Sequence, residues 1–246
     1  MRTLILALMF FFSSLVSADE VSVALAANFA STFDKISAQF KTNTGHTVVA
    51  SMGSSGALYA QIVNGAPYEV FLSADAERPR MLVERGNAVS GTTSTYAIGR
   101  LVLWSSKPTL VDNKGALLKS GFNGRIAIAN PVTAPYGLAA QQTLERLGLW
   151  NTMQKTVVRG QNITQTFQFA ASGSVDAAFI SLSQIKSGDY VGKGSYWLVP
   201  QTFHDPIEQQ LVLLEKGKHR PAAKALIEFI RSSEGRKIIA HAGYDE

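Results

Sequence analysis

Residues 21–72 read VSVALAANFASTFDKISAQFKTNTGHTVVASMGSSGALYAQIVNGAPYEVFL, and this stretch decides the fold. Three short apolar runs, at residues 21–25, 47–50 and 70–72, predict β-strands. In the two segments between these runs, apolar residues recur at helical spacing, and a glycine closes each segment. The order strand, helix, strand, helix, strand predicts a parallel sheet with right-handed crossovers.

The remainder of the chain repeats this pattern, and its tail is expected to return to the first unit. Strands and helices alternate again between residues 101 and 180, which predicts a second α/β unit. The tail from His204 onward holds one apolar strand, at residues 210–214, and an amphipathic helix. Because this is too little for a domain, we expect the tail to complete the first unit.

We therefore predict an α/β fold of two lobes, each a mostly parallel sheet flanked by helices. The chain crosses between the lobes twice in this prediction, near residues 96–103 and 200–208. Two crossings make a hinge that can close around a ligand. The predicted boundaries are residues 19–98 with 206–246 for the first lobe and residues 99–205 for the second.

The first 18 residues are predicted to be a secretory signal peptide. Arg2 supplies a positive start, residues 4–12 are almost wholly apolar, and Val16-Ser17-Ala18 is typical of a cleavage site. The apolar run is too short to span a bilayer. The chain contains no cysteine, which excludes disulfides, thiolate chemistry and a lipid anchor on a cysteine. We expect a free periplasmic protein.

The composition favours a packed core and argues against a nucleic-acid partner. Of the 246 residues, 46% are hydrophobic and 17% are charged, so the chain can build a core without disulfides. The formal net charge is +5, but the basic residues are scattered and aromatic residues are not interleaved with them. A mild positive field suits an anionic ligand, and equally a solvated basic surface.

The turns that follow the predicted strands are the candidate sites, because ligands of open α/β sheets bind beyond the carboxyl ends of the strands. These turns are rich in small residues and neutral hydrogen-bond donors and contain no carboxylate. Asn28 is also predicted to cap the helix that follows it. The candidate residues in these turns are Ala27, Asn28, Ser55, Tyr136, Ile163 and Ser181.

Helix starts with free N–H groups attract anions. Several of them converging on one point would hold a dianion without any formal positive charge. A protonated phosphate carries a hydrogen that needs an acceptor, whereas a fully deprotonated tetrahedral dianion needs donors only. Sulfate, molybdate and tungstate fit this pattern at neutral pH, and phosphate fits it less well.

An exported enzyme using Asp75 and His204 is the alternative from a different class, and an adhesin or sensor with a borrowed fold is a third. None of the four histidines has the spacing of a catalytic triad or a metal site. GxSxG, HExxH and P-loop motifs are absent from the sequence. We expect no catalysis and no bare metal ion, and we expect Asp75 to cap the next helix or to hold a contact between domains.

Four motifs stand at the predicted turns: Ala26-Ala27-Asn28, Gly53-Ser54-Ser55, Asn64-Gly65-Ala66-Pro67 with Ser73-Ala74-Asp75, and Asn130-Pro131 with Pro135-Tyr136-Gly137. This set resembles the periplasmic molybdate-binding proteins of ABC transporters, which have the two-lobed type II solute-binding fold. The resemblance extends over nearly the whole chain after the signal peptide. It is most specific between the Gly-Ala-Pro and Ser-Ala-Asp segments.

The resemblance implies a role for each candidate residue. Asn28 and Ser55 match side-chain donors, with the N–H of Ala27 beside them, and Tyr136 and Ile163 match positions where a backbone N–H donates. Ser181 matches a position that is a tyrosine donor in some members, and a serine reaches less far. Asn130 and Glu69 both stand where the family commonly has aspartate, which leaves the tuning of the cavity open.

The resemblance also implies a function: capture of molybdate, and of tungstate, in the periplasm, and delivery to an ABC permease in the inner membrane. Molybdenum would be bound only as its oxyanion, without a cofactor, and the protein would act as a monomer. A receptor for sulfate or another small tetrahedral oxyanion is the alternative among binding proteins.

Overall fold

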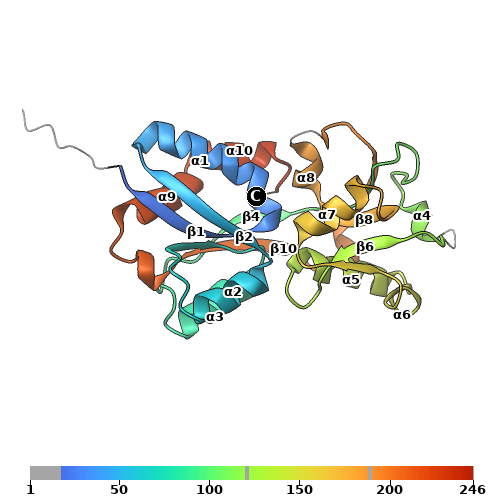
Figure 1. Cartoon of the computed structure of the whole chain (residues 1–246), viewed down its shortest axis with the longest axis horizontal. Helices are drawn as coiled ribbons and strands as arrows, with labels where there is room; N and C mark the ends of the chain where they lie inside the picture. The colour runs from blue at the N-terminus through green and yellow to red at the C-terminus, as the bar shows by residue number, and fades with distance from the viewer. Residues whose placement is uncertain (1–17, 120–121, 188–189, 246) are drawn as a thin grey trace, which may run out of the picture.

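The computed structural model of the chain describes residues 18–119, 122–187 and 190–245 (Figure 1). The predicted signal peptide, up to residue 17, lies outside the described residues. Two five-stranded sheets lie end to end along the long axis of the molecule, and helices cover both faces of each sheet. We call the sheet that contains the first strand, with its helices, lobe 1, and the other sheet with its helices lobe 2.

Lobe 1 is built from the beginning and the end of the chain. Its sheet has the strand order β2-β1-β3-β10-β4. Helices α1, α9 and α10 cover one face and α2 and α3 cover the other (Figure 1). The elements are β1 (Glu20–Ala26), η1 (Ala27–Phe29), α1 (Ala30–Thr44), β2 (Thr47–Gly53), α2 (Ser55–Val63), β3 (Val70–Leu72), α3 (Glu77–Glu84), β4 (Ser94–Gly99), β10 (Ile207–Leu213), η4 (Glu215–Gly217), α9 (Pro221–Arg231) and α10 (Ser233–His241).

Lobe 2 is built from the middle of the chain, and its sheet has the order β7-β6-β8-β5-β9. Helices α7 and α8 lie on one side of this sheet and α5 and α6 on the other (Figure 1). The elements are β5 (Leu101–Ser105), α4 (Ala116–Lys119), β6 (Ile126–Ala129), α5 (Pro135–Arg146), α6 (Trp150–Met153), β7 (Val158–Gly160), α7 (Ile163–Ala171), β8 (Ala177–Ser181), α8 (Leu182–Lys186), β9 (Ser195–Leu198) and η3 (Gln201–Phe203).

Each sheet is mostly parallel, as predicted, and one strand of each sheet runs against the others. In lobe 1, β1 pairs in parallel with β2 and β3, whereas β10 is antiparallel to both β3 and β4. In lobe 2, β6 pairs in parallel with β7 and β8, whereas β5 is antiparallel to β8 and β9. The antiparallel pairs arise because β10 and β5 are the strands by which the chain enters a lobe after crossing.

The cores follow from the sequence pattern. In α1, Phe33, Ile36 and Phe40 lie on one face and are buried against the sheet of lobe 1. The helix ends at Gly45, whose φ of 77° favours glycine over residues with a Cβ. The tail completes lobe 1 as predicted, since β10 lies between β3 and β4.

The two crossings lie where the sequence placed them. β4 ends at Gly99 in one sheet and β5 begins at Leu101 in the other, and the second crossing joins Leu198 to Ile207. The predicted lobe boundaries by residue number stay a prediction. Within the described part of the chain, no helix has the length and apolar character needed to cross a membrane.

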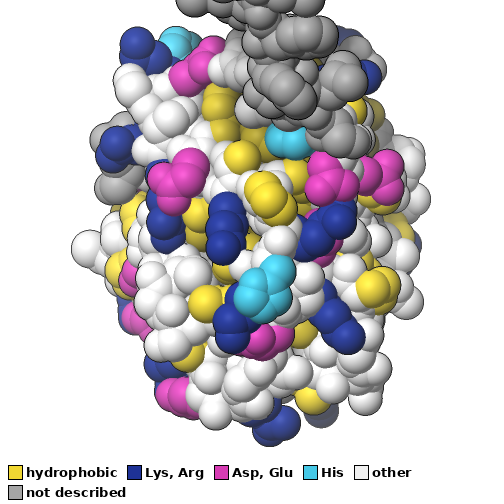
Figure 2. All heavy atoms as spheres, turned by 90° about the vertical axis from the view of Figure 1, so that its left-hand side faces the viewer, with side chains coloured by type: hydrophobic (Ala, Val, Ile, Leu, Met, Phe, Trp, Pro, Cys, Tyr) yellow, Lys and Arg dark blue, Asp and Glu magenta, His cyan; other side chains and the backbone are white. Residues whose placement is uncertain are grey.

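The surface at the far end of lobe 1 carries a mixture of charges. Figure 2 shows basic and acidic side chains interspersed on this face, with small apolar areas between them. Such a surface lacks the continuous basic stripe that a nucleic-acid backbone requires.

Gly137 is the point at which α5 packs most closely on its sheet. A Cβ at this position would overlap the carbonyl group of Ala129 at the end of β6. We predict that Gly137→Ala lowers the free energy of unfolding by roughly 1–3 kcal/mol, the usual cost of overpacking. Thermal denaturation measures this change. Leu138→Ala is the control, because Leu138 is 45% exposed and its loss should change stability by less than about 0.5 kcal/mol. Equal stability of the two variants would contradict the close approach.

Candidate functional site

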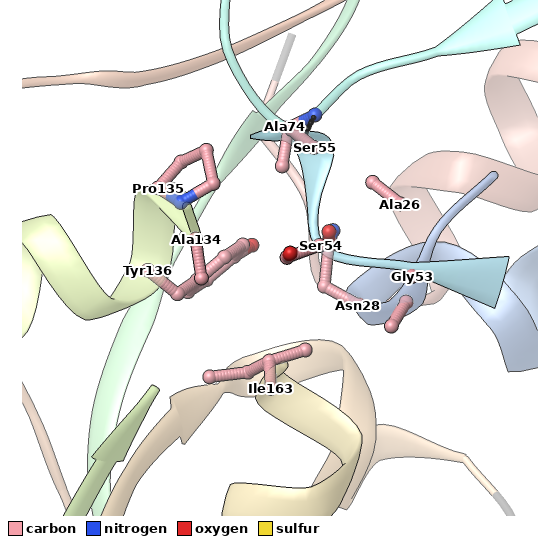
Figure 3. Close-up of a pocket in the computed structure, with 11 residues that line it drawn as sticks. Ala26, Asn28, Gly53, Ser54, Ser55, Ala74, Ala134, Pro135, Tyr136 and Ile163 are labelled. Atoms are coloured by element: carbon pink, nitrogen blue, oxygen red, sulfur yellow. Dashed lines mark hydrogen bonds between the residues drawn. The ribbon is translucent and has the colours of Figure 1, made fainter. Parts of the chain in front are cut away.

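A small pocket lies between the two lobes, at the carboxyl ends of their parallel strands. From lobe 1 it receives the ends of β1 and β2 and the turn after β3, and from lobe 2 the starts of α5 and α7. Figure 3 shows the side chains of both lobes around one space. The lining residues are Ala26, Ala27, Asn28, Gly53, Ser54, Ser55, Ala74, Ala134, Pro135, Tyr136 and Ile163.

Three helices begin at this pocket. α2 starts at Ser55, α5 at Pro135 and α7 at Ile163, and they are 9, 12 and 9 residues long. The first N–H groups of a helix have no acceptor within it, and the helix dipole places partial positive charge there. Since proline has no N–H, Tyr136 supplies the first N–H of α5. The arrangement directs helix starts from both lobes toward one small space.

Local sequence fixes each of these helix starts. In lobe 2, the side chain of Asn162 accepts the N–H of Gln165 at 3.0 Å, which caps α7 and leaves Ile163 as its first residue. In α5, Pro135 stands at the first position, where its fixed φ suits a helix start. The Asn162 cap and the proline at the first position of α5 place the N–H groups of Ile163 and Tyr136 at the pocket wall.

Ser55 is the best-defined side-chain donor of the pocket. It is 1% exposed, and its Oγ accepts the N–H of Ala74 at 2.9 Å. That bond occupies the oxygen and leaves the hydroxyl hydrogen for a ligand. Ser54, beside it, also lines the pocket, and its hydroxyl makes no hydrogen bond to the residues that the structure describes. Ser55 was among the site residues predicted from the sequence, and Ser54 was not.

The pocket carries no formal charge. Among the described residues that line it, none is Asp, Glu, Lys, Arg or His. Tyr136 is the titratable residue of the lining, and burial, aided by the nearby Tyr244 and Tyr96, raises its pKa well above the ordinary value of 10.0. The phenol is therefore neutral at physiological pH. A dianion in this pocket would meet donors and no carboxylate.

Asn28 lies at the pocket, but the expectation that it caps α1 needs correction. The N-cap of α1 is Phe29, and Asn28 belongs to the short helix η1, so its side chain does not cap α1. Its Nδ2 donates to Oε1 of Gln209 at 2.9 Å and to Oη of Tyr244 at 3.1 Å. Both amide hydrogens are thus used within the protein, because the packing behind the pocket supplies two acceptors.

Ser181 is the candidate that the structure does not bring to the pocket. It ends β8 and stands at the start of α8, and its hydroxyl contacts Oε1 of Gln184 at 3.0 Å and the hydroxyl of Ser183 at 3.0 Å. The short side chain is used at this helix start and does not line the cavity. The other five candidates, Ala27, Asn28, Ser55, Tyr136 and Ile163, meet there.

Several lining residues were missed because they carry no distinctive chemistry. Gly53, Ala74 and Ala134 contribute small size and backbone groups. The signal for Ala74 was its place directly after a strand, in the Ser-Ala-Asp segment. Gln209, which bonds Asn28, was also missed. It is fully buried and shares the inward face of β10 with Ile207 and Leu211. A single polar residue among the alternating apolar residues of this strand could have indicated it.

Asp75 bonds the start of α3, one of the two roles predicted for it, and its partner Arg78 reaches lobe 2. It accepts the N–H of Arg78 at 2.9 Å in the first turn of α3 and forms an ion pair with the Arg78 guanidinium. Nη2 of Arg78 donates across the cleft to the carbonyl of Val132 at 3.1 Å. Beside it, the N–H of Gly56 donates to the carbonyl of Thr133 at 2.9 Å. These contacts join the two lobes at the pocket.

The enzyme hypothesis gains nothing from the geometry. His204 is buried and its Nδ1 is hydrogen-bonded to the Asp205 carbonyl at 2.7 Å, while burial lowers its pKa. It does not line the pocket. Among the described residues, no group of three or more His, Asp or Glu side chains could hold a metal ion. Asp75 is committed to Arg78.

Two α/β lobes with an uncharged, donor-lined pocket between them define the class of two-lobed solute-binding proteins. The pattern of the family described as bacterial extracellular solute-binding protein matches residues 21–245. This protein belongs to that family.

Its relatives extend the likeness over most of the chain. The molybdate-binding protein ModA of Azotobacter vinelandii is 46% identical over 228 residues, which are 92% of this chain and 90% of the relative. The protein of the same name from Rhodobacter capsulatus is 46% identical over 230 residues, 93% of this chain and 89% of the relative. The solved structure of the A. vinelandii periplasmic molybdate-binding protein superposes with a TM-score of 0.88 at 42% identity, covering 92% of this chain and 99% of that one.

Ser55 gives the first test of the pocket. Ser55→Ala removes a hydroxyl donor and also leaves the N–H of Ala74 without its acceptor. We expect affinity for molybdate, measured by calorimetry, to fall by roughly 10-fold or more, since a hydrogen bond to a charged group contributes about 1.5–3 kcal/mol. Ser172→Ala, at an exposed serine after α7, is the control and should leave the affinity unchanged. An unchanged affinity in Ser55→Ala would remove this residue from the site.

Arg78 gives a test of the contacts that join the lobes. Arg78→Ala removes the bond to Val132 and leaves Asp75 unpaired. We expect molybdate and tungstate affinities to fall by the same factor, about fivefold, because a hydrogen bond contributes about 1 kcal/mol whichever anion is enclosed. Arg80→Ala is the matched control, since Arg80 pairs only with Glu84 on its own helix. Unequal losses for the two anions would mean that Arg78 acts on the ligand itself.

Proposed function

We propose that this protein captures molybdate outside the cytoplasmic membrane and delivers it to an ABC importer. The observation that carries the proposal is the pocket, whose walls offer hydroxyl and N–H donors and no charged group. The proposal is supported by relatives at 46% identity that are named molybdate-binding proteins. The anion is bound as a ligand and not as a cofactor.

The donors come from both lobes in this proposal. Ser55 donates its hydroxyl from lobe 1, together with the N–H groups at Ala27 and Asn28. The N–H groups of Tyr136 and Ile163 donate from lobe 2. Such oriented dipoles stabilise a buried anion because they need no reorganisation when it enters.

Binding proceeds without covalent change, and we infer no reaction at this site. The pocket lacks a general base, a nucleophile paired with a base, and a metal cluster among the described residues. Selectivity against sulfate then rests on cavity size, because sulfate presents the same charge and shape in a smaller frame. Phosphate is excluded because its proton would find no carboxylate acceptor in the described lining.

The cellular role follows from the family and from the predicted signal peptide. Export through residues 1–18 would place the chain in the periplasm, where the monomeric closed form meets the permease. A membrane fractionation of cells expressing the full chain checks this placement, and a cytoplasmic product of full length would contradict it.

Calorimetric titration of purified, ligand-stripped protein with molybdate, tungstate, sulfate and phosphate tests the function. We expect tight one-to-one binding of molybdate and tungstate, weak binding of sulfate and no heat with phosphate. Equally tight sulfate would mean that cavity size does not select the anion. No heat with any anion, from protein shown to be folded by circular dichroism, would overturn the proposed function while leaving the fold intact.

A further inference from the structure

A buried cluster of two amides and three phenols lies directly behind the pocket. We call Asn28, Gln209, Tyr96, Tyr136 and Tyr244 the amide–phenol cluster. All five are 8% exposed or less, and Gln209 is fully buried. Asn28 and Tyr136 line the pocket, whereas the other three do not. The cluster therefore connects the ligand site to residues that no ligand can touch.

The hydrogen bonds of the cluster engage the nitrogen of the Asn28 side-chain amide but not its oxygen. Nδ2 gives its two hydrogens to Gln209 and Tyr244, at 2.9 and 3.1 Å. Oδ1 accepts no hydrogen bond from the residues that the structure describes. A carbonyl oxygen at the wall of an anion pocket repels the anion, because both carry negative charge. In this orientation the Asn28 side chain opposes the ligand that its backbone attracts.

The same cluster has a second complete set of hydrogen bonds. Gln209 Oε1 now accepts from Asn28 and from Tyr96 at 3.1 Å, and its Nε2 donates to Oη of Tyr136 at 3.2 Å. If both amides turn over, Nε2 of Gln209 donates to Oδ1 of Asn28 and to Oη of Tyr96. Oε1 of Gln209 then accepts the hydroxyl hydrogen of Tyr136, and Nδ2 of Asn28 is free to donate to the anion.

The other members of the cluster accommodate this exchange. In the present arrangement the single hydroxyl hydrogen of Tyr96 points to Oε1 of Gln209, and once Nε2 faces this phenol the hydrogen can turn to the carbonyl of Ser73, at 3.2 Å. Tyr244 can donate its single hydroxyl hydrogen to Oδ1 of Asn28 instead of to its present acceptor, which is either the Asn28 carbonyl or the Ser183 hydroxyl, each at 2.9 Å. Burial raises the pKa of Tyr244 to about 12, so this phenol keeps the proton that the exchange requires.

The packing allows the amides to turn but not to move away. A Cβ at Gly99, on the crossing between the lobes, would lie 2.8 Å from Nε2 of Gln209 and would overlap the hydroxyl of Tyr136. On this side, therefore, the backbone at Gly99 packs directly against Gln209 and Tyr136. Turning a planar amide by half a rotation exchanges a nitrogen and an oxygen of nearly equal size, so it needs no extra volume.

We propose that Gln209 is a positioning residue for anion binding: it turns over together with Asn28 when the oxyanion enters, so that Nδ2 of Asn28 becomes a donor to the ligand. This inference rests on the proposed function. Neither amide can turn alone, because two carbonyl oxygens or two NH2 groups would then face each other in a buried site, where an unpaired polar group costs about 1–3 kcal/mol.

A double-mutant cycle with molybdate tests the coupling. We expect Asn28→Ala to weaken binding about 10- to 100-fold and Gln209→Met, of similar length, to weaken it about 10-fold. The double variant should bind no more than about twofold more weakly than Asn28→Ala alone, because Gln209 acts only through Asn28. Losses that multiply would overturn the proposal. Gln210→Met is the matched control, since Gln210 is the next residue of β10 and bonds Glu208 and Thr95 outside the cluster.

Side-chain amide signals in nuclear magnetic resonance test the turn in the unmutated protein, so the proposal does not depend on whether a variant folds. On addition of molybdate, the NH2 signals of both Asn28 and Gln209 should shift, and those of Gln210 should not. A shift of Asn28 alone, or of neither, would overturn the concerted turn. Failure of the unmutated protein to bind molybdate would instead overturn the proposed function, so the two failures are distinguishable.

Discussion

The constraint on which this structure depends is the burial of a doubly charged anion without a cation beside it. Removing an ion from water is costly unless its surface is covered by hydrogen bonds. In the proposed site, Ser55, Tyr136 and Ile163 would cover the anion with hydroxyl and backbone donors. Three helix starts converge on the same small volume. Helix starts can converge in this way only where several parallel strands end together. Binding an anion with helix starts therefore requires this sheet architecture.

Closure of the lobes follows from the same constraint. The pocket is lined from both lobes, so an anion held there is enclosed only when the two lobes meet. Ala26, Ala27 and Ala74 of lobe 1 join the hydrophobic cluster of lobe 2, which excludes water around the pocket. In such a dry site each hydrogen bond is electrostatically stronger than in water. Small side chains at these positions bring the two backbones together, and a larger residue would fill the space that the anion needs.

The sequence allowed much of this to be predicted, and the failures have physical causes. The strands at 21–25 and 70–72 and the donor turns at Ser55 and Ile163 were predictable, because apolar runs and helix-start residues are local signals. The reversed direction of β10 and β5 within these mostly parallel sheets was not, since it depends on where the chain crosses. Ser181 does not line the pocket, because a serine at a strand end can bond the start of the next helix as readily as a ligand. The partners of Asn28 lie more than 180 residues away along the chain, at Gln209 and Tyr244, and no local pattern reports such a contact.

The Ser-Ala-Asp turn after β3 shows how ligand contact and lobe closure are combined in adjacent residues. The N–H of Ala74 holds the oxygen of Ser55, which orients the hydroxyl donor. The next residue, Asp75, brings a carboxylate to the edge of an anion pocket, where its charge would oppose the ligand. Arg78 neutralises it and also donates from Nη2 to the carbonyl of Val132 in lobe 2. The Asp75 carboxylate would repel the ligand if it were unpaired. Because its counter-ion Arg78 also bonds the other lobe, the carboxylate instead helps to hold the two lobes together.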